Sequence, residues 1–167
     1  MKKIIAMLLA MAMLLCFAAC QSNETEATGS KEPVQDSFTF TYKGTKIALH
    51  APAADVVAAL GEPKTYSEST SCAFEGLDKS YGYGSFYLET YPIGDKDYVY
   101  GWYCVDDMVE NDEGICIGSS KADVEAAYGA ENYNGTNAFE VTKGSGKLTI
   151  ILENDVVSSV QYVIITE

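Results

Sequence analysis

The sequence predicts an α+β fold, a tandem duplication of a unit made of a helix plus a three-stranded antiparallel sheet, preceded by a short hairpin. Residues 47–61 align without a gap with residues 115–129, and seven of the fifteen aligned positions are identical. After each passage, apolar and polar residues alternate as in strands with one buried and one solvated face. The offset of 68 residues is longer than a solenoid repeat, so we expect both copies in one pseudo-symmetric domain.

Residues 1–19 are predicted to be a signal peptide. Two lysines precede an apolar run from residue 4 to residue 17, and two alanines stand directly before Cys20. The run falls short of the length that spans a bilayer comfortably, which favours a cleaved signal. The passage resembles bacterial lipoprotein signals, although Phe17 stands where leucine is usual. This resemblance implies that Cys20 is acylated and holds the protein at the extracellular face of the cell membrane; the alternative is an ordinary signal with an incidental cysteine.

Residues 20–37 are predicted to be a disordered tether. They contain almost no large apolar side chains and are rich in Ser, Thr, Glu and Gln, so they cannot bury enough surface to order themselves. The folded part then consists of repeat 1 over residues 38–111 and repeat 2 over residues 112–167. This length suits one compact domain.

A leading hairpin is predicted over residues 38–49, with Lys43-Gly44 at its turn. The helix of repeat 1 follows. Pro52 suits its first turn, where the missing N–H costs nothing, and Gly61 is expected to end it in a left-handed conformation.

Repeat 2 is expected to open with a short strand at residues 115–117. Its helix is capped by Ser119 or Ser120, and Asp123 in the first turn is favoured by the helix dipole. Three strands then follow each helix. They cover residues 71–75, 85–91 and 98–105 in repeat 1, and residues 139–143, 147–153 and 156–164 in repeat 2.

The passages ADVVAALGEP at 54–63 and ADVEAAYGAE at 122–131, with the strands after them, resemble the beta-lactamase inhibitor proteins and the small outer-membrane-assembly lipoproteins of the SmpA/OmlA type. This resemblance implies a helix packed on an antiparallel sheet and a role in binding other proteins. Residues 71–84 and 112–129 are similar to uncharacterised secreted proteins of gut Firmicutes, which implies no activity.

The charge of the chain excludes some partners. The net charge is −13, and loss of the two signal lysines lowers the basic residues from 11 to 9 against 24 acidic ones, which gives −15. All basic residues are lysines. Nucleic acid is not expected as a partner, because its binding depends on clustered cations that neutralise phosphates. Direct electrostatic adhesion to anionic lipid is disfavoured for the same reason.

The sequence predicts no catalytic residue, no metal site and no cofactor. His50 is the only histidine and is expected at the surface, no Cys/His spacing fits zinc, and no Gly-rich loop fits phosphate. The acidic residues at 106–113 are interpreted as a solvated turn, with a calcium site as the alternative. An alternative enzymatic hypothesis is a hydrolase of cell-envelope glycan, with Glu75, Glu89 and Asp97 as candidate carboxylates.

Three cysteines remain after lipidation, and in an oxidising exterior they are expected to form one disulfide. We predict that it joins Cys104 to Cys116 across the acidic connection, which leaves Cys72 as a buried free thiol. A bridge between Cys72 and Cys104 stays open, because strand faces alone do not fix which neighbours meet.

Aromatic residues are concentrated in repeat 1, whereas the matching strands of repeat 2 carry mostly Val, Ile and Leu. Tyr87, Tyr91 and Tyr103 are our candidates for a recognition face, since tyrosine buries much area and keeps a polar tip. Ordinary strand filling is the alternative. We expect a lipid-anchored extracellular binding protein without enzymatic activity that recognises a protein or peptide; besides the hydrolase, a purely structural envelope lipoprotein is the other alternative.

Overall fold

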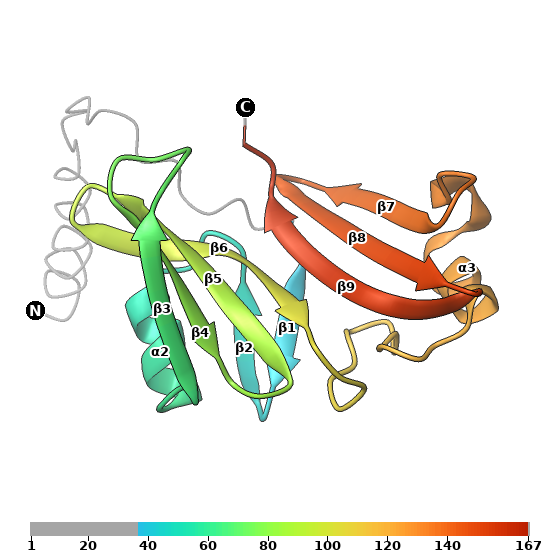
Figure 1. Ribbon diagram of the computed structural model, residues 1–167, viewed down its shortest axis with the longest axis horizontal. Coiled ribbons are helices and arrows are strands. Elements are labelled where there is room, and N and C mark those ends of the chain that lie inside the picture. Colours follow the sequence, from blue (N-terminus) through green and yellow to red (C-terminus); the bar gives the residue numbers. More distant parts are fainter. Residues whose placement is uncertain (1–36, 167) are drawn as a thin grey trace, which may run out of the picture. The chain divides into compact units, whose positions relative to one another are not determined.

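Seven antiparallel strands make the main sheet of the computed structural model, which describes residues 37–166 (Figure 1). The predicted signal peptide at residues 1–19, Cys20 and all of the tether before Ser37 lie outside the described residues. Within the described part of the chain, no helix is long and apolar enough to cross a membrane.

The strand order of the main sheet places the C-terminal strand in its interior. In sheet order the strands are β3 (Thr65–Thr70), β4 (Leu77–Gly82), β5 (Phe86–Ile93), β6 (Lys96–Cys104), β9 (Val156–Ile164), β8 (Gly146–Glu153) and β7 (Ala138–Lys143). The contact between β6 and β9 joins the two halves of the sheet through three residue pairs. These pairs are Gly101 with Val163, Trp102 with Tyr162, and Tyr103 with Gln161.

A separate two-stranded sheet is formed by β1 (Thr39–Tyr42) and β2 (Thr45–Ala48). Its turn residues Lys43 and Gly44 have φ angles of 49° and 83°. A two-residue hairpin turn with both φ angles positive matches the right-handed twist of the strands. The predicted leading hairpin is therefore confirmed.

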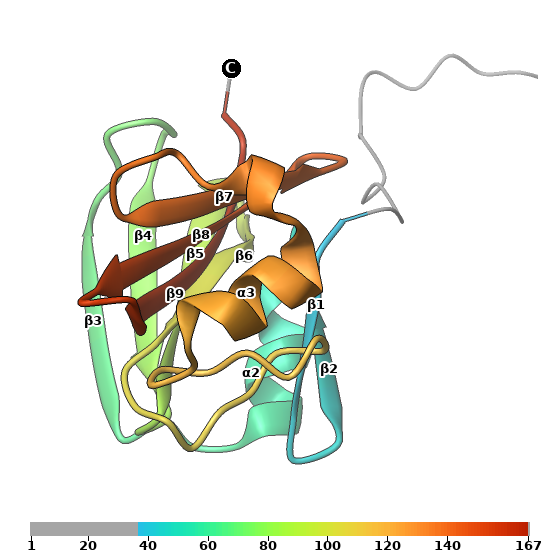
Figure 2. The same ribbon diagram turned by 90° about the vertical axis from the view of Figure 1, so that its right-hand side faces the viewer.

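The two α-helices and the hairpin lie on the same side of the main sheet (Figure 2). The helices are α2 (Ala53–Leu60) and α3 (Lys121–Tyr128), and a 3₁₀ turn η1 (Ala130–Asn132) follows α3. Each presents few apolar residues to the core, with Val56 and Val124 as the main ones. Among residues 37–166, no helix lies on the opposite face of the sheet.

Aromatic side chains fill the core where the hairpin packs on the junction of β6 and β9. Phe40 stacks on Trp102 at 5.7 Å between ring centroids, and Trp102 stacks on Tyr162 at 4.9 Å. Phe38 meets Tyr162 edge to face at 5.2 Å. Phe38 and Phe40 therefore pack β1 and the residue before it against both halves of the sheet.

The start of α3 has a capping box. The Ser120 side chain accepts a hydrogen bond from the Asp123 backbone N–H, and the Asp123 carboxylate accepts one from the Ser120 backbone N–H. Together these bonds satisfy two of the backbone donors that every helix start leaves unpaired. Ser120 Oγ also donates to Oδ2 of Asp123 at 2.7 Å, and this bond, followed by the one from the Ser120 backbone N–H, lowers the pKa of Asp123. The helix predicted with Ser120 as its cap is confirmed.

The predicted fold class is wrong. The molecule is mostly β, and its strands belong to one seven-stranded sheet and one two-stranded sheet rather than to two copies of a helix plus three strands. Four strands follow α2, whereas three follow α3. The aligned passages share a helix with a glycine after it, and Gly61 and Gly129 both have positive φ. That local similarity does not extend to the arrangement of the strands.

Two predicted strands are absent from the described residues. The segment 71–75 is the connection between β3 and β4, and residues 115–117 form part of a turn in which the Ser119 N–H donates to the Cys116 carbonyl. Sequence reasoning missed β3 because all six of its side chains are exposed. A strand with no buried face has no apolar alternation that predicts it.

Candidate functional site

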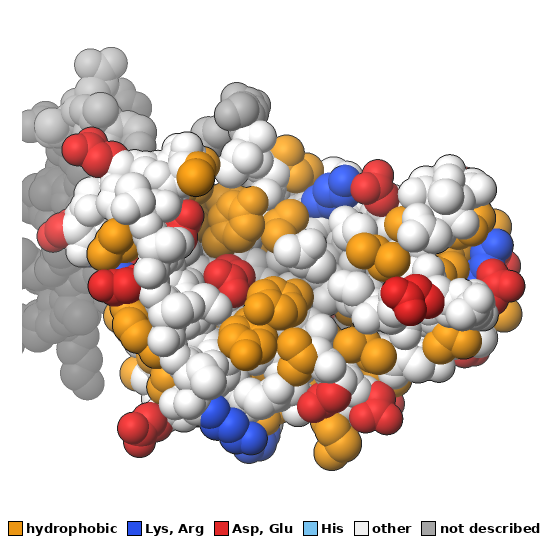
Figure 3. All heavy atoms as spheres, viewed as in Figure 1, with side chains coloured by type: hydrophobic (Ala, Val, Ile, Leu, Met, Phe, Trp, Pro, Cys, Tyr) orange, Lys and Arg blue, Asp and Glu red, His pale blue; other side chains and the backbone are white. Residues whose placement is uncertain are grey.

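The uncovered face of the main sheet carries two of the three tyrosines predicted for recognition, Tyr87 and Tyr103. Along β5, Phe86 and Leu88 point into the core, so Tyr87 and Glu89 point to the opposite face. Tyr103 of β6 lies directly across from Tyr87. Figure 3 shows hydrophobic side chains gathered on this face over the middle of the sheet, with an acidic group among them. We call this surface the outer face.

Tyr87 and Tyr103 form a stacked pair at the centre of the outer face. Their ring centroids are 5.0 Å apart and the planes differ by 9°. Gly82 on β4 makes room for the pair, because a Cβ atom there would lie 2.8 Å from Cε1 of Tyr87. Both tyrosines are half-buried. Burial, and then the charge of Glu89, raise the pKa of Tyr103.

Tyr91 does not belong to the accessible surface, which corrects one predicted recognition residue. Only 4% of it is exposed. Phe74, from the connection between β3 and β4, packs on its ring at 4.6 Å between centroids, and its hydroxyl contacts His50. Tyr91 is therefore part of the packing that holds this connection on the sheet.

A pocket of about 420 Å³ opens on the outer face beside the stacked pair. It combines aromatic side chains with two carboxylates. Its lining residues are Cys72, Ala73, Phe74, Asp78, Glu89, Thr90, Tyr100, Tyr103 and Gln161. We call this the outer pocket.

The two carboxylates of the outer pocket lie in different surroundings. Glu89 Oε1 accepts a hydrogen bond of 2.8 Å from Ser80 Oγ. Burial raises the pKa of Glu89, the hydrogen bond from Ser80 opposes this shift, and the charge of Asp78 adds to it. Oδ1 of Asp78 is buried and has no hydrogen-bond partner among the described residues. The pocket thus contains two carboxylates and no lysine.

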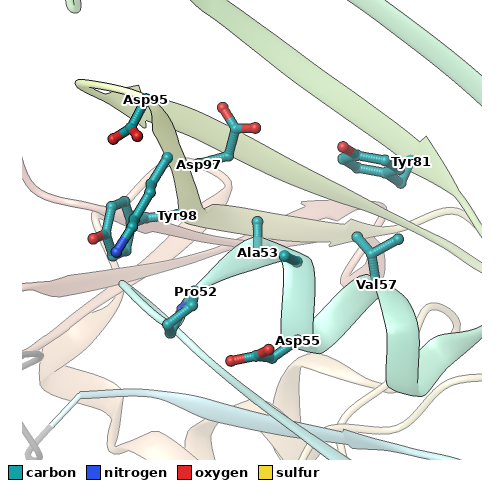
Figure 4. A pocket seen from close by; sticks show the side chains of 10 residues that line it. Pro52, Ala53, Asp55, Val57, Tyr81, Asp95, Asp97 and Tyr98 are labelled. Carbon is teal, nitrogen blue, oxygen red and sulfur yellow. The ribbon is translucent and has the colours of Figure 1, made fainter.

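A second hollow, of about 520 Å³, lies between α2 and the hairpin of β5 and β6. Figure 4 shows Asp55 on α2 at one side and Asp95 and Asp97 on the strand hairpin at the other. Asp97 is neutralised by Lys79, whose Nζ donates to Oδ2 at 2.6 Å. Lys96 also lines the hollow, so its charges are mixed.

The carboxylates of the hydrolase hypothesis are not brought together. Glu75 is exposed in the connection between β3 and β4, Glu89 lines the outer pocket, and Asp97 lines the hollow below α2. Asp78, with Glu89, is the acidic residue that the structure instead places in the outer pocket. Sequence reasoning missed Asp78, because its partner is set by the pairing of β4 with β5.

The three described cysteines are free thiols, so the predicted Cys104–Cys116 disulfide is not formed in this structure. Cys104 is buried, and burial, with smaller contributions from Asp106 and Cys116, raises the pKa of its thiol to about 11. Cys72 was expected to be buried but is exposed, because it lies in a connection and not in a strand.

His50 is a structural residue of the turn after β2. Its ring contacts the hydroxyl of Tyr91 at 2.8 Å and that of Ser145 at 3.0 Å, and its φ is 64°. The contact of Ser145 Oγ with Nε2 is the kind that joins a nucleophile to its base, but a tyrosine hydroxyl contacts Nδ1, where a triad has a carboxylate.

The acidic connection at residues 106–113 is organised by hydrogen bonds within the chain. Asn111 Oδ1 accepts from the backbone N–H groups of Glu113 and Ile115, and Glu113 accepts from the Tyr128 hydroxyl at 2.8 Å. Across the described residues, no group of three or more His, Cys, Asp or Glu side chains is placed to hold a metal ion.

No family model and no curated protein matches the chain. Among solved structures, it is similar to an extracellular protein with an SCP domain from Bacillus anthracis str. Ames, at 12% identity and a TM-score of 0.42. The match covers 70% of this chain and 44% of the other, so the chain spans less than half the length of that protein. The comparisons assign no family. The resemblance to beta-lactamase inhibitor proteins and SmpA/OmlA lipoproteins gains no support from them.

Proposed function

We propose that this chain is a lipid-anchored extracellular binding protein that recognises a protein or peptide through the outer face. The observation that carries the proposal is the stacked pair of Tyr87 and Tyr103, half-buried at the centre of a sheet face that neither α-helix covers. The signal sequence and Cys20 support the extracellular, anchored location.

The chemistry of the outer face supports recognition of another chain. Tyrosine contributes a large contact area with few torsions to freeze, and its hydroxyl keeps hydrogen bonds available at the edge of a contact. The pair is held in place by its mutual stacking and by the space at Gly82, so little ordering is needed on binding. A rigid aromatic centre with polar neighbours such as Glu89 and Gln161 matches the anatomy of protein interfaces.

The test is capture of partners from the surface fraction of the producing organism by the tagged mature protein. We expect Tyr87→Ala/Tyr103→Ala to lose at least one specific partner that the wild type retains. Tyr66→Ala is a matched control, because Tyr66 is a 52% exposed tyrosine of β3 that contacts Tyr81 with its ring tilted by 51° and lies away from the pair. Equal recovery of every partner by the double variant and the wild type would overturn the proposal.

A further inference from the structure

We propose that the outer pocket binds the cationic side chain of a lysine or arginine presented by the partner. This inference rests on the proposed function, and it assigns the chemistry of the group that the face recognises. It is carried by the juxtaposition of two carboxylates, Asp78 and Glu89, with the aromatic side chains Phe74, Tyr100 and Tyr103 around one pocket.

The negative charge of the outer pocket is not balanced by the protein. None of the lining residues is a lysine, and the three ion pairs of the described residues involve neither Asp78 nor Glu89. Lys79 directly follows Asp78, but alternation along β4 sends it to the other face, where it pairs with Asp97. A cation from outside is therefore the group that complements this pocket.

The carboxylate of Asp78 is not fully satisfied by the protein. Buried polar atoms are nearly always hydrogen-bonded, since an unpaired one costs free energy. Oδ1 of Asp78 has no partner among the described residues but is itself closed to solvent, so a guest in the pocket meets the carboxylates of Asp78 and Glu89 through the atoms that line it. A guest with several N–H donors satisfies this set, whereas an anion would be repelled.

The aromatic lining adds a second source of selectivity. A cation near the face of an aromatic ring is attracted by the ring's quadrupole, and the aliphatic stem of lysine or arginine packs on the same apolar surface. The volume of about 420 Å³ accommodates one such side chain with room for water. A neutral side chain of similar length would gain only the apolar part of this contact.

The experiment titrates the isotope-labelled mature protein with Nα-acetyl-lysine methylamide while backbone amide NMR signals are followed. The neutral probe Nα-acetyl-norleucine methylamide is titrated in parallel. We expect saturable shifts on β4, β5 and β6 with the lysine probe. The norleucine probe should bind at least about tenfold more weakly. Glu89→Gln and Asp78→Asn should each weaken lysine binding by about tenfold.

Asp95→Asn is the matched control, because it removes the same charge from the hollow below α2 and should leave the affinity unchanged. Equal affinity for both probes, no saturable shift with the lysine probe, or equal loss in Asp95→Asn and Glu89→Gln would each overturn the inference. Two carboxylate variants are used so that one misfolded variant does not decide the result. If the lysine probe fails while Tyr87→Ala/Tyr103→Ala still loses its partner, this inference falls and the proposed function stands.

Discussion

His50 Nδ1 lies 2.8 Å from the hydroxyl oxygen of Tyr91, a side chain of which only 4% is exposed. The other ring nitrogen lies 3.0 Å from Ser145 Oγ in the turn between β7 and β8. One imidazole therefore ties β5 to the far half of the sheet.

His50→Ala should destabilise the protein by about 1–3 kcal/mol, because it leaves the buried Tyr91 hydroxyl without this partner. Urea unfolding followed by circular dichroism measures the loss. The double variant with Tyr91→Phe should lose less than the sum of the two single variants, because both remove the same bond. Strict additivity would show that the contact contributes nothing.

Gly101→Ala should weaken the junction of β6 and β9. A Cβ atom at this position would overlap the backbone carbonyl oxygen of Tyr162, which cannot swing aside as a flexible side chain can. We expect a loss of about 3 kcal/mol or more in thermal unfolding, at the upper end of overpacking effects. Gly44→Ala has open space but a φ of 83°, so its cost should stay near the 1–2 kcal/mol of backbone strain. A smaller loss of stability for Gly101→Ala than for Gly44→Ala would refute the close approach of position 101 to the Tyr162 carbonyl oxygen.

The thiols should differ in reactivity. In the native protein at pH 8, iodoacetamide should modify the exposed Cys72 and leave Cys104 intact, since burial raises the pKa of Cys104 to about 11 and shields the sulfur. Peptide mass spectrometry after timed quenching gives the rates, and a urea-unfolded sample shows that both sites can react. The same peptide mass spectrometry reveals any Cys104–Cys116 disulfide in protein recovered from the producing organism. Equal labelling of both sites in the folded protein is the contrary result.

Glu89→Gln should stabilise the protein at neutral pH. Burial makes the pKa of Glu89 higher in the folded than in the unfolded chain. The protonated side chain therefore makes its full contribution to stability below the ordinary pKa of 4.5, and this contribution is lost as the pH rises through the folded pKa. The amount by which the Tm of Glu89→Gln exceeds that of the wild type should therefore grow from pH 4 and level off above that folded pKa. Glu153→Gln, an exposed glutamate at the end of β8, controls for the general loss of negative charge. A constant difference across the range would contradict the shift.

Cys20→Ser should release the protein from the membrane or leave its signal uncleaved, because acylation needs the thiol. Fractionation of the producing cells, with intact-mass measurement of the recovered protein, distinguishes these results from unchanged anchoring. Cys16→Ser is the control, since two leucines precede Cys16 and make it a poor acceptor. If Cys20→Ser stays anchored at the wild-type mass, the lipoprotein prediction is wrong.

Local features of the fold could be predicted from the sequence. Lys43-Gly44 and Ser120 with Asp123 act within a few residues of one another, and β9 has the bounds 156–164 that alternation predicts. The fold class could not be predicted in this way. It depends on which strands become neighbours, and the pairing of β6 with β9 joins distant segments through only three residue pairs.

The same distinction between local and long-range information applies to the residues of the candidate site. Tyr87 and Tyr103 could be placed on one face, because alternation along two strands needs no long-range information. Tyr91 was misjudged because Phe74 covers it from a connection whose path the sequence did not reveal. Asp78 was not predicted as a site residue, because only the folded sheet brings it close to Glu89 on the neighbouring strand.

The interior position of β9 has a consequence for how the protein is made. Until the C-terminal residues arrive, β6 and β8 each present an unpaired edge, and the hairpin at residues 39–48 lacks Tyr162 on one side of its aromatic contacts. The sheet is therefore incomplete until β9 has been synthesised, and the long-range pairing that closes it forms late.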